Sequence, residues 1–85
     1  MIPIPAPSDL KEKLLMSAAV LTCQGQYEVI IENYRSIKSL TETKVEVQTK
    51  TCVVTVSGMD LMAVYYTKEA MKITGKINKI EYIQK

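Results

Sequence analysis

The chain has 85 residues, of which 47% are hydrophobic and 24% are charged. This length allows one small domain, and the composition argues against disorder over most of the chain. The 11 basic and 9 acidic residues are scattered, and the aromatic residues are all tyrosines, so no basic and aromatic surface for nucleic acid is indicated.

The first seven residues, MIPIPAP, alternate proline with apolar residues. Proline lacks the backbone N–H, so residues 1–7 are expected to form an extended arm outside the core. Ser8 is a suitable N-cap for a short amphipathic helix over about residues 8–18, in which Leu10 and Leu14 share one face. Residues 8–85 are expected to form a single domain.

The opening residues lack the basic and long apolar regions of a signal peptide. No apolar stretch approaches the roughly 20 residues that a membrane-spanning helix needs. We therefore expect an intracellular, soluble protein without direct membrane insertion.

From about residue 20 the hydrophobic pattern changes to a period of two and β-branched residues become frequent, which predicts about six strands. No segment between them is long enough for the crossover helix of a parallel sheet. The expected fold is mainly β: a single small antiparallel sheet, rolled or open-barrel-like, with one short N-terminal helix. The side chains expected to face the core are Tyr27, Val29, Ile31, Ile37, Leu40, Val45, Val47, Cys52, Val54 and Val56.

Two glycines are expected to change the direction of the chain. Gly58, together with Asp60, supplies turn chemistry that should end the strand TCVVTVSG. Gly75 interrupts the last run, ITGKINKIEY, and predicts a bulge or a sharp bend, because glycine accepts positive φ without penalty.

Residues suited to catalysis or metal binding are scarce. There is no histidine to act as a general base, and most carboxylates fall at outward or turn positions. Cys23 and Cys52 match no metal-binding spacing, so two buried thiols are the favoured interpretation, with a disulfide left open. We expect no catalytic residue, no cofactor and no metal, and hence no enzyme. An enzymatic alternative requires a pocket that gathers Glu28, Glu32 and a tyrosine.

The segment LMAVYY is apolar on both faces of a strand. A small sheet that does not close leaves edges whose N–H and C=O groups can pair with another chain. Methionines such as Met59 and Met71 adapt to contacts, although the alternative is that they simply fill the core. The candidate interaction residues are Met62, Val64, Tyr65, Tyr66 and Lys76.

Three segments in order, IENYRSI, VEVQTKTCVVTVSGMDL and KITGKINKIEY, resemble the YabP/YqfC family of bacterial sporulation proteins. The resemblance runs from about residue 26 to residue 83. Tyr34 stands where the family usually has His, Ser36 where Gly is common, and Ala19 where Pro usually follows the helix. The residues that fall on the family pattern include Ile31, Glu32, Asn33, Arg35, Gly58, Leu61, Ile73, Gly75, Ile77, Ile80 and Tyr82.

The resemblance implies a non-enzymatic protein made during endospore formation, located in the mother-cell cytoplasm, at the forespore surface or in the spore coat. Family members are similar to small partners of integral membrane sporulation proteins, and one branch is associated with the coat. We expect assembly through a β-edge and an apolar patch, either as a homo-oligomer or with an integral membrane sporulation protein. The alternative is a small OB-like module that binds a ligand or nucleic acid, which the strand count and the pI near 8.5 would suit.

Overall fold

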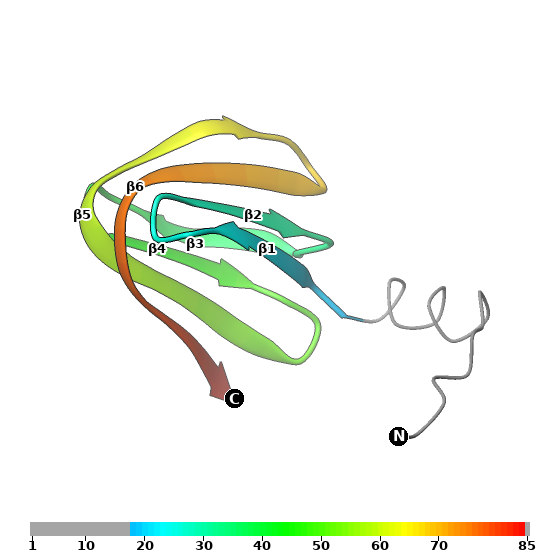
Figure 1. The fold of residues 1–85 in the computed structure, drawn as a ribbon. Coiled ribbons are helices and arrows are strands. Elements are labelled where there is room, and N and C mark those ends of the chain that lie inside the picture. The colour runs from blue at the N-terminus through cyan, green and yellow to red at the C-terminus, as the bar shows by residue number, and fades with distance from the viewer. Residues whose placement is uncertain (1–17, 85) are drawn as a thin grey trace, which may run out of the picture.

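The computed structural model describes residues 18–84, which form one six-stranded antiparallel sheet in the spatial order β1-β2-β6-β5-β4-β3 (Figure 1). The strands are β1 (Val20–Gln24), β2 (Glu28–Glu32), β3 (Ser36–Leu40), β4 (Lys44–Gln48), β5 (Cys52–Tyr66) and β6 (Ala70–Gln84). The mainly β, antiparallel fold is thus confirmed. The expected arm over 1–7 and the helix over about 8–18 lie outside the described residues, apart from Ala18, which is not helical. None of the described residues belongs to a helix that could cross a membrane.

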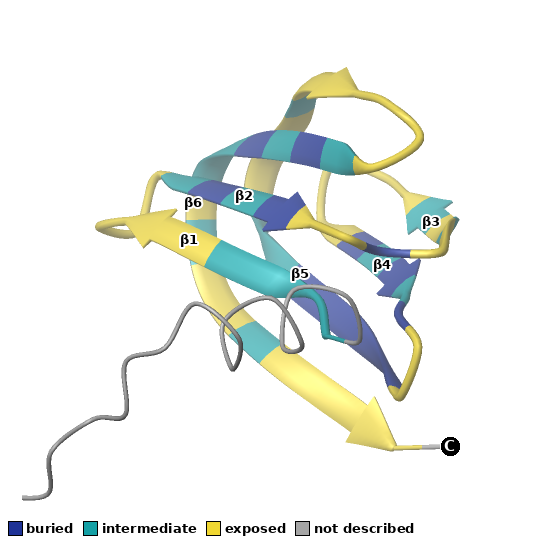
Figure 2. Cartoon of the chain, turned by 90° about the vertical axis from the view of Figure 1, so that its right-hand side faces the viewer, coloured by how far each residue is buried: buried dark blue, intermediate teal, exposed yellow. Residues whose placement is uncertain are grey.

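β5 and β6 are long enough to belong to two layers of a rolled sheet (Figures 1 and 2). In the first layer, β2 pairs with residues 70–74 of β6, and β1 pairs with β2. In the second layer, β4 pairs with residues 53–57 of β5, and β3 pairs with β4. The core lies between the layers, because side chains alternate in direction along each strand.

The expected alternation fills this core with few exceptions. Val29, Ile31, Val45 and Val47 are buried, as the period of two predicts. The remaining members of the core are Tyr34, Cys52, Val54, Val56, Leu61, Met71 and Ile73.

Tyr27 and Leu40 are corrections to the expected core. Tyr27 is 66% exposed because it lies in the β1–β2 turn, where its N–H donates to the Gln24 carbonyl. Leu40 is 41% exposed because it ends β3, a strand at the edge of the sheet.

The turn expected at Gly58 and Asp60 is wrong, because β5 continues to Tyr66. Pairing with β6 persists through register shifts, and Asp60 takes a φ of 54° within the strand. An irregularity does lie at Gly75, as expected, but the extra residue of this bulge belongs to β5 and not to the closing strand. Two residues of β5, Asp60 and Leu61, lie opposite the single Gly75, whose φ is 137°. The glycines therefore bend the strand pair without interrupting it.

The backbones of β5 and β6 approach closely at this bend. A Cβ atom on Gly58 would overlap the Lys76 carbonyl oxygen. A Cβ atom on Gly75 would lie 2.6 Å from the Asp60 carbonyl oxygen. Because backbone atoms cannot swing away as a flexible side chain can, both positions require glycine.

The β3–β4, β4–β5 and β5–β6 turns each contain a threonine with the same hydrogen-bond pattern. In each, the Thr hydroxyl accepts backbone N–H groups two and three residues later, and donates to the carbonyl three residues later. The Thr N–H donates to that same carbonyl. Thr41, Thr49 and Thr67 therefore set where each hairpin closes.

The connection from β2 to β3 joins the two layers. Asn33, with a φ of 66°, donates its N–H to the Glu69 carbonyl at 2.8 Å and its side-chain amide to the Ala18 carbonyl at 2.8 Å. Arg35 donates its N–H to the Gln48 carbonyl in the second layer, at 2.7 Å. Between them, Tyr34 is buried, and its hydroxyl donates to the Thr67 carbonyl. This connection therefore fixes the tip of the β5–β6 hairpin to the body of the domain.

We expect Gly58→Ala and Gly75→Ala each to lower the free energy of unfolding by about 3 kcal/mol or more, because the new methyl group meets backbone. Gly25→Ala is the matched control: its φ is also positive, at 53°, but the nearest atom is a Tyr27 ring carbon 3.7 Å from the new Cβ. That change should cost about 1–2 kcal/mol. Urea unfolding measures the free energy of unfolding of all three variants. Losses at Gly58 and Gly75 no larger than the loss at Gly25 would show that the crossing tolerates a side chain.

Tyr34→Phe should lower the free energy of unfolding by about 1 kcal/mol at neutral pH, through loss of one hydrogen bond. Burial raises the pKa of the Tyr34 phenol, and the nearby Tyr66 phenol adds to the rise. A raised folded-state pKa gives stability that is complete below the ordinary tyrosine value of about 10 and is lost as pH rises through the folded pKa. The difference in melting temperature between the wild type and Tyr34→Phe should therefore become smaller at alkaline pH. A difference that stays the same at all pH values would contradict this.

Candidate interaction surface

Exposed apolar side chains concentrate on the second half of β5. Of the nine exposed large hydrophobic residues among the described ones, five lie between residues 59 and 66, so the clustering is local. We call this group the β5 patch; its members, between 43% and 64% exposed, are Met59, Met62, Val64, Tyr65 and Tyr66. Figure 2 shows this end of β5 as exposed, whereas the first half of the same strand is buried.

The backbone of the β5 patch is also open on one side. β6 pairs with residues 62–66, but β4 pairs only with residues 53–57. The last backbone contact on the β4 side is the donation from the Leu61 N–H to the Glu42 carbonyl, at 2.8 Å. Within the described part of the chain, residues 62–66 therefore form a free edge. A register shift between Ala63 and Tyr65 interrupts it, so side chains contribute more to this surface than a regular ladder of hydrogen bonds.

The predicted interaction residues are mostly brought together. Met62, Val64, Tyr65 and Tyr66 are adjacent on one strand and exposed. Lys76 is exposed too, but lies across from Met59 at the bend, so it borders the patch at one end.

The methionines divide between surface and core. Met59 and Met62 are exposed, whereas Met71 is fully buried against β2. The alternative that the methionines fill the core therefore holds for Met71, whereas the contact role of Met59 and Met62 stays a prediction. Met59, which lies beside Gly58 at the bend, joins this exposed group although it is not among the candidate interaction residues named above.

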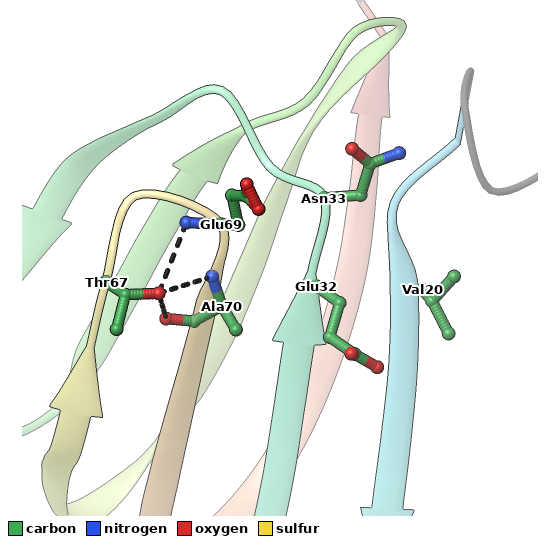
Figure 3. A pocket seen from close by; sticks show the side chains of 6 residues that line it. All are labelled: Val20, Glu32, Asn33, Thr67, Glu69 and Ala70. Atoms are coloured by element: carbon green, nitrogen blue, oxygen red, sulfur yellow. Dashed lines mark hydrogen bonds between the residues drawn. The ribbon is translucent and has the colours of Figure 1, made fainter.

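An open hollow lies beside the hairpin tip, between β1, β2 and the turn after β5 (Figure 3). Its lining includes Glu32 and Glu69, whose carboxylates point in different directions in Figure 3. Thr67 is occupied by its own turn. Glu28 is not in the lining; its carboxylate pairs with the Lys72 ammonium at 3.3 Å. This hollow therefore does not gather Glu28, Glu32 and a tyrosine, as the enzymatic alternative would need.

The other family-pattern residues either stabilise the fold or are exposed at the surface. Asn33, Gly58, Leu61 and Gly75 hold the crossing and the connection described above. Glu32, Arg35 and Tyr82 are exposed.

The two cysteines differ in exposure. Both are free; Cys52 is buried, but Cys23 is exposed on the outer strand β1. The expectation of two buried thiols is therefore wrong for Cys23, and the disulfide left open is not present. Among the residues that the structure describes, no three His, Cys, Asp or Glu side chains are grouped as for a metal ion.

Comparison with known proteins gives one result. Neither the curated proteins nor the solved structures yield a match. The model of the YabP family matches residues 17–85, which includes the whole described sheet. This family is not a known enzyme family, and membership suggests a role related to sporulation. The chain, of which residues 17–85 match this model, belongs to the YabP family.

Proposed function

We propose that this protein is a non-enzymatic assembly protein of endospore formation, which binds another protein through the β5 patch. The observation that carries the proposal is the run of exposed apolar residues, Met62, Val64, Tyr65 and Tyr66, on a strand segment whose edge is free among the described residues. Met62 and Tyr65 lie beside Thr74 and Lys72 on the outer face, whereas Tyr66 lies beside the buried Met71. An apolar group of this kind on a small domain is typical of a protein–protein contact.

The chemistry of the β5 patch fits such a contact. Tyrosine and methionine are enriched in protein interfaces, where tyrosine supplies a large apolar ring and a polar end. Exposed lysines, Lys68 and Lys76, lie at the two ends of the patch and form a polar rim. A partner segment with apolar side chains and acidic flanks would complement this arrangement.

The partner that the family resemblance favours is an integral membrane sporulation protein, bound from the mother-cell cytoplasm at the forespore surface. A site in the spore coat is the other location that the resemblance supports. In either place the protein would act by assembly, as a homo-oligomer or with that partner.

The nucleic-acid alternative has little support on this surface. Lys72, opposite Tyr65, forms an ion pair with Glu28 at 3.3 Å, so a phosphate group would have to compete with that carboxylate. Titration with single-stranded oligonucleotides at low salt tests the alternative, because phosphate contacts would give binding that weakens steeply with salt.

Replacing the gene with a Met62→Lys/Tyr65→Lys variant should reduce the yield of heat-resistant spores to near that of a full deletion. The reason is that two charges in the apolar centre oppose burial against a partner. Both side chains are exposed, so the melting temperature of the purified variant should stay within a few degrees of the wild type.

Tyr27→Lys is the matched control, because Tyr27 is an exposed tyrosine outside the β5 patch. It should sporulate as the wild type does. Normal spore yield in the full deletion would refute a role in sporulation. A normal yield with the double variant alone would refute the β5 patch as the contact.

A further inference from the structure

A second free backbone edge runs along the end of β6. The β1–β2 hairpin covers this side of β6 only as far as Ile77, whose N–H donates to the Gln26 carbonyl at 2.8 Å. Beyond it, residues 78–84 pair with β5 alone among the residues described. From Lys79 to Gln84 that pairing has no register shift, so this edge is regular where the edge of the β5 patch is bulged.

Exposed apolar side chains lie on both faces of this edge. Tyr82 is 61% exposed and Ile83 is 46% exposed. Tyr82 lies beside Val54 on the face toward the core, and Ile83 lies beside Val53 on the outer face. A regular edge with apolar side chains is suited to pairing with another strand, and natural sheets usually protect such edges.

We propose that two copies of this chain pair antiparallel along residues 80–84 of β6, with Tyr82 of each copy at the two-fold axis. A strand edge is complementary to itself under a two-fold rotation, because each backbone N–H meets a C=O of the other copy. Directly opposed residues must have their side chains on the same face of the joined sheet. An axis between two residues would oppose neighbours that point to opposite faces, so the two-fold axis passes through a residue.

Sterics and charge select among the axes. An axis at Ile80 would bring Ile83 of the second copy against Ile77, where the β1–β2 turn already occupies the edge. An axis at Glu81 would place that carboxylate opposite itself, which is destabilising. An axis at Ile83 would place Tyr82 opposite Gln84 of the second copy, without an aromatic cross-strand pair.

The axis at Tyr82 avoids these conflicts and opposes five residues of each copy. Tyr82 then faces Tyr82 of the second copy, an aromatic cross-strand pair. Ile83 packs against the aliphatic part of Glu81 of the second copy. The Glu81 carboxylate keeps its own ion pair with the Lys79 ammonium, at 3.5 Å.

This contact goes beyond the proposed function and does not depend on it. The β5 patch lies beside residues 71–76 of β6, away from residues 80–84, so it stays free in the dimer. Each dimer would present two copies of the β5 patch. Two linked sites bind a multivalent target more tightly than one, which suits an assembly protein.

Sedimentation and oxidative cross-linking test the proposal with the full chain in a Cys23→Ser background, which removes the exposed thiol. The parent should sediment as a dimer. Tyr82→Cys should form a disulfide-linked dimer under mild oxidation, because opposed Cα atoms in an antiparallel pair lie about 5.5 Å apart. Glu81→Cys alone should not cross-link, but a mixture of Glu81→Cys and Ile83→Cys chains should.

Tyr82→Lys should weaken the dimer about tenfold or more without changing the melt of the monomer. Tyr27→Lys, equally exposed but on the β1–β2 turn, should leave the dimer unchanged. A monomeric parent would overturn the proposal, including the case in which residues 1–17 cover this edge. Self-linking of Glu81→Cys would overturn the Tyr82 register. Neither result bears on the spore counts that test the β5 patch.

Discussion

The close crossing of β5 and β6 is the constraint on which the rest of this structure depends. At Gly58 and Gly75 the two backbones approach so closely that a side chain on either glycine would meet a carbonyl oxygen of the other strand. This approach lets one pair of 15-residue strands bend and serve both layers. A sheet of six strands can then enclose a core without a second sheet, which matters in a chain this small.

The same bend creates the free edges. β2 covers only the first half of β6, and β4 covers only the first half of β5, because each neighbour stays in its own layer. Among the described residues, 62–66 and 78–84 are the halves without a second neighbour, and Met62, Tyr65, Tyr82 and Ile83 are exposed there. The surface available for assembly is therefore a geometric consequence of how the core is closed.

Several polar side chains of the described residues hold the frame. Thr41, Thr49 and Thr67 close hairpins, and the Tyr34 hydroxyl joins the β2–β3 connection to the hairpin tip. Glu28 is paired with Lys72. This use of polar groups agrees with membership of a family that is not a known enzyme family, and it directs attention to the apolar edges.

The sequence by itself determined the fold class, most of the core, the presence of an irregularity at Gly75 and the family. Side-chain direction in a strand is a local property, so the alternation around Val29 and Val45 was sufficient to predict burial. Tertiary structure decided the rest. Whether Gly58 and Asp60 make a turn or a bulge depends on whether β6 continues to pair beyond them. Met71 is buried because β2 covers its half of β6, whereas Met62 is exposed on a half of β5 that β4 does not cover. The three hairpin turns could have been predicted locally, because a Thr lies three residues before each of β4, β5 and β6. The free edges could not, because an edge depends on which strands pair beside it.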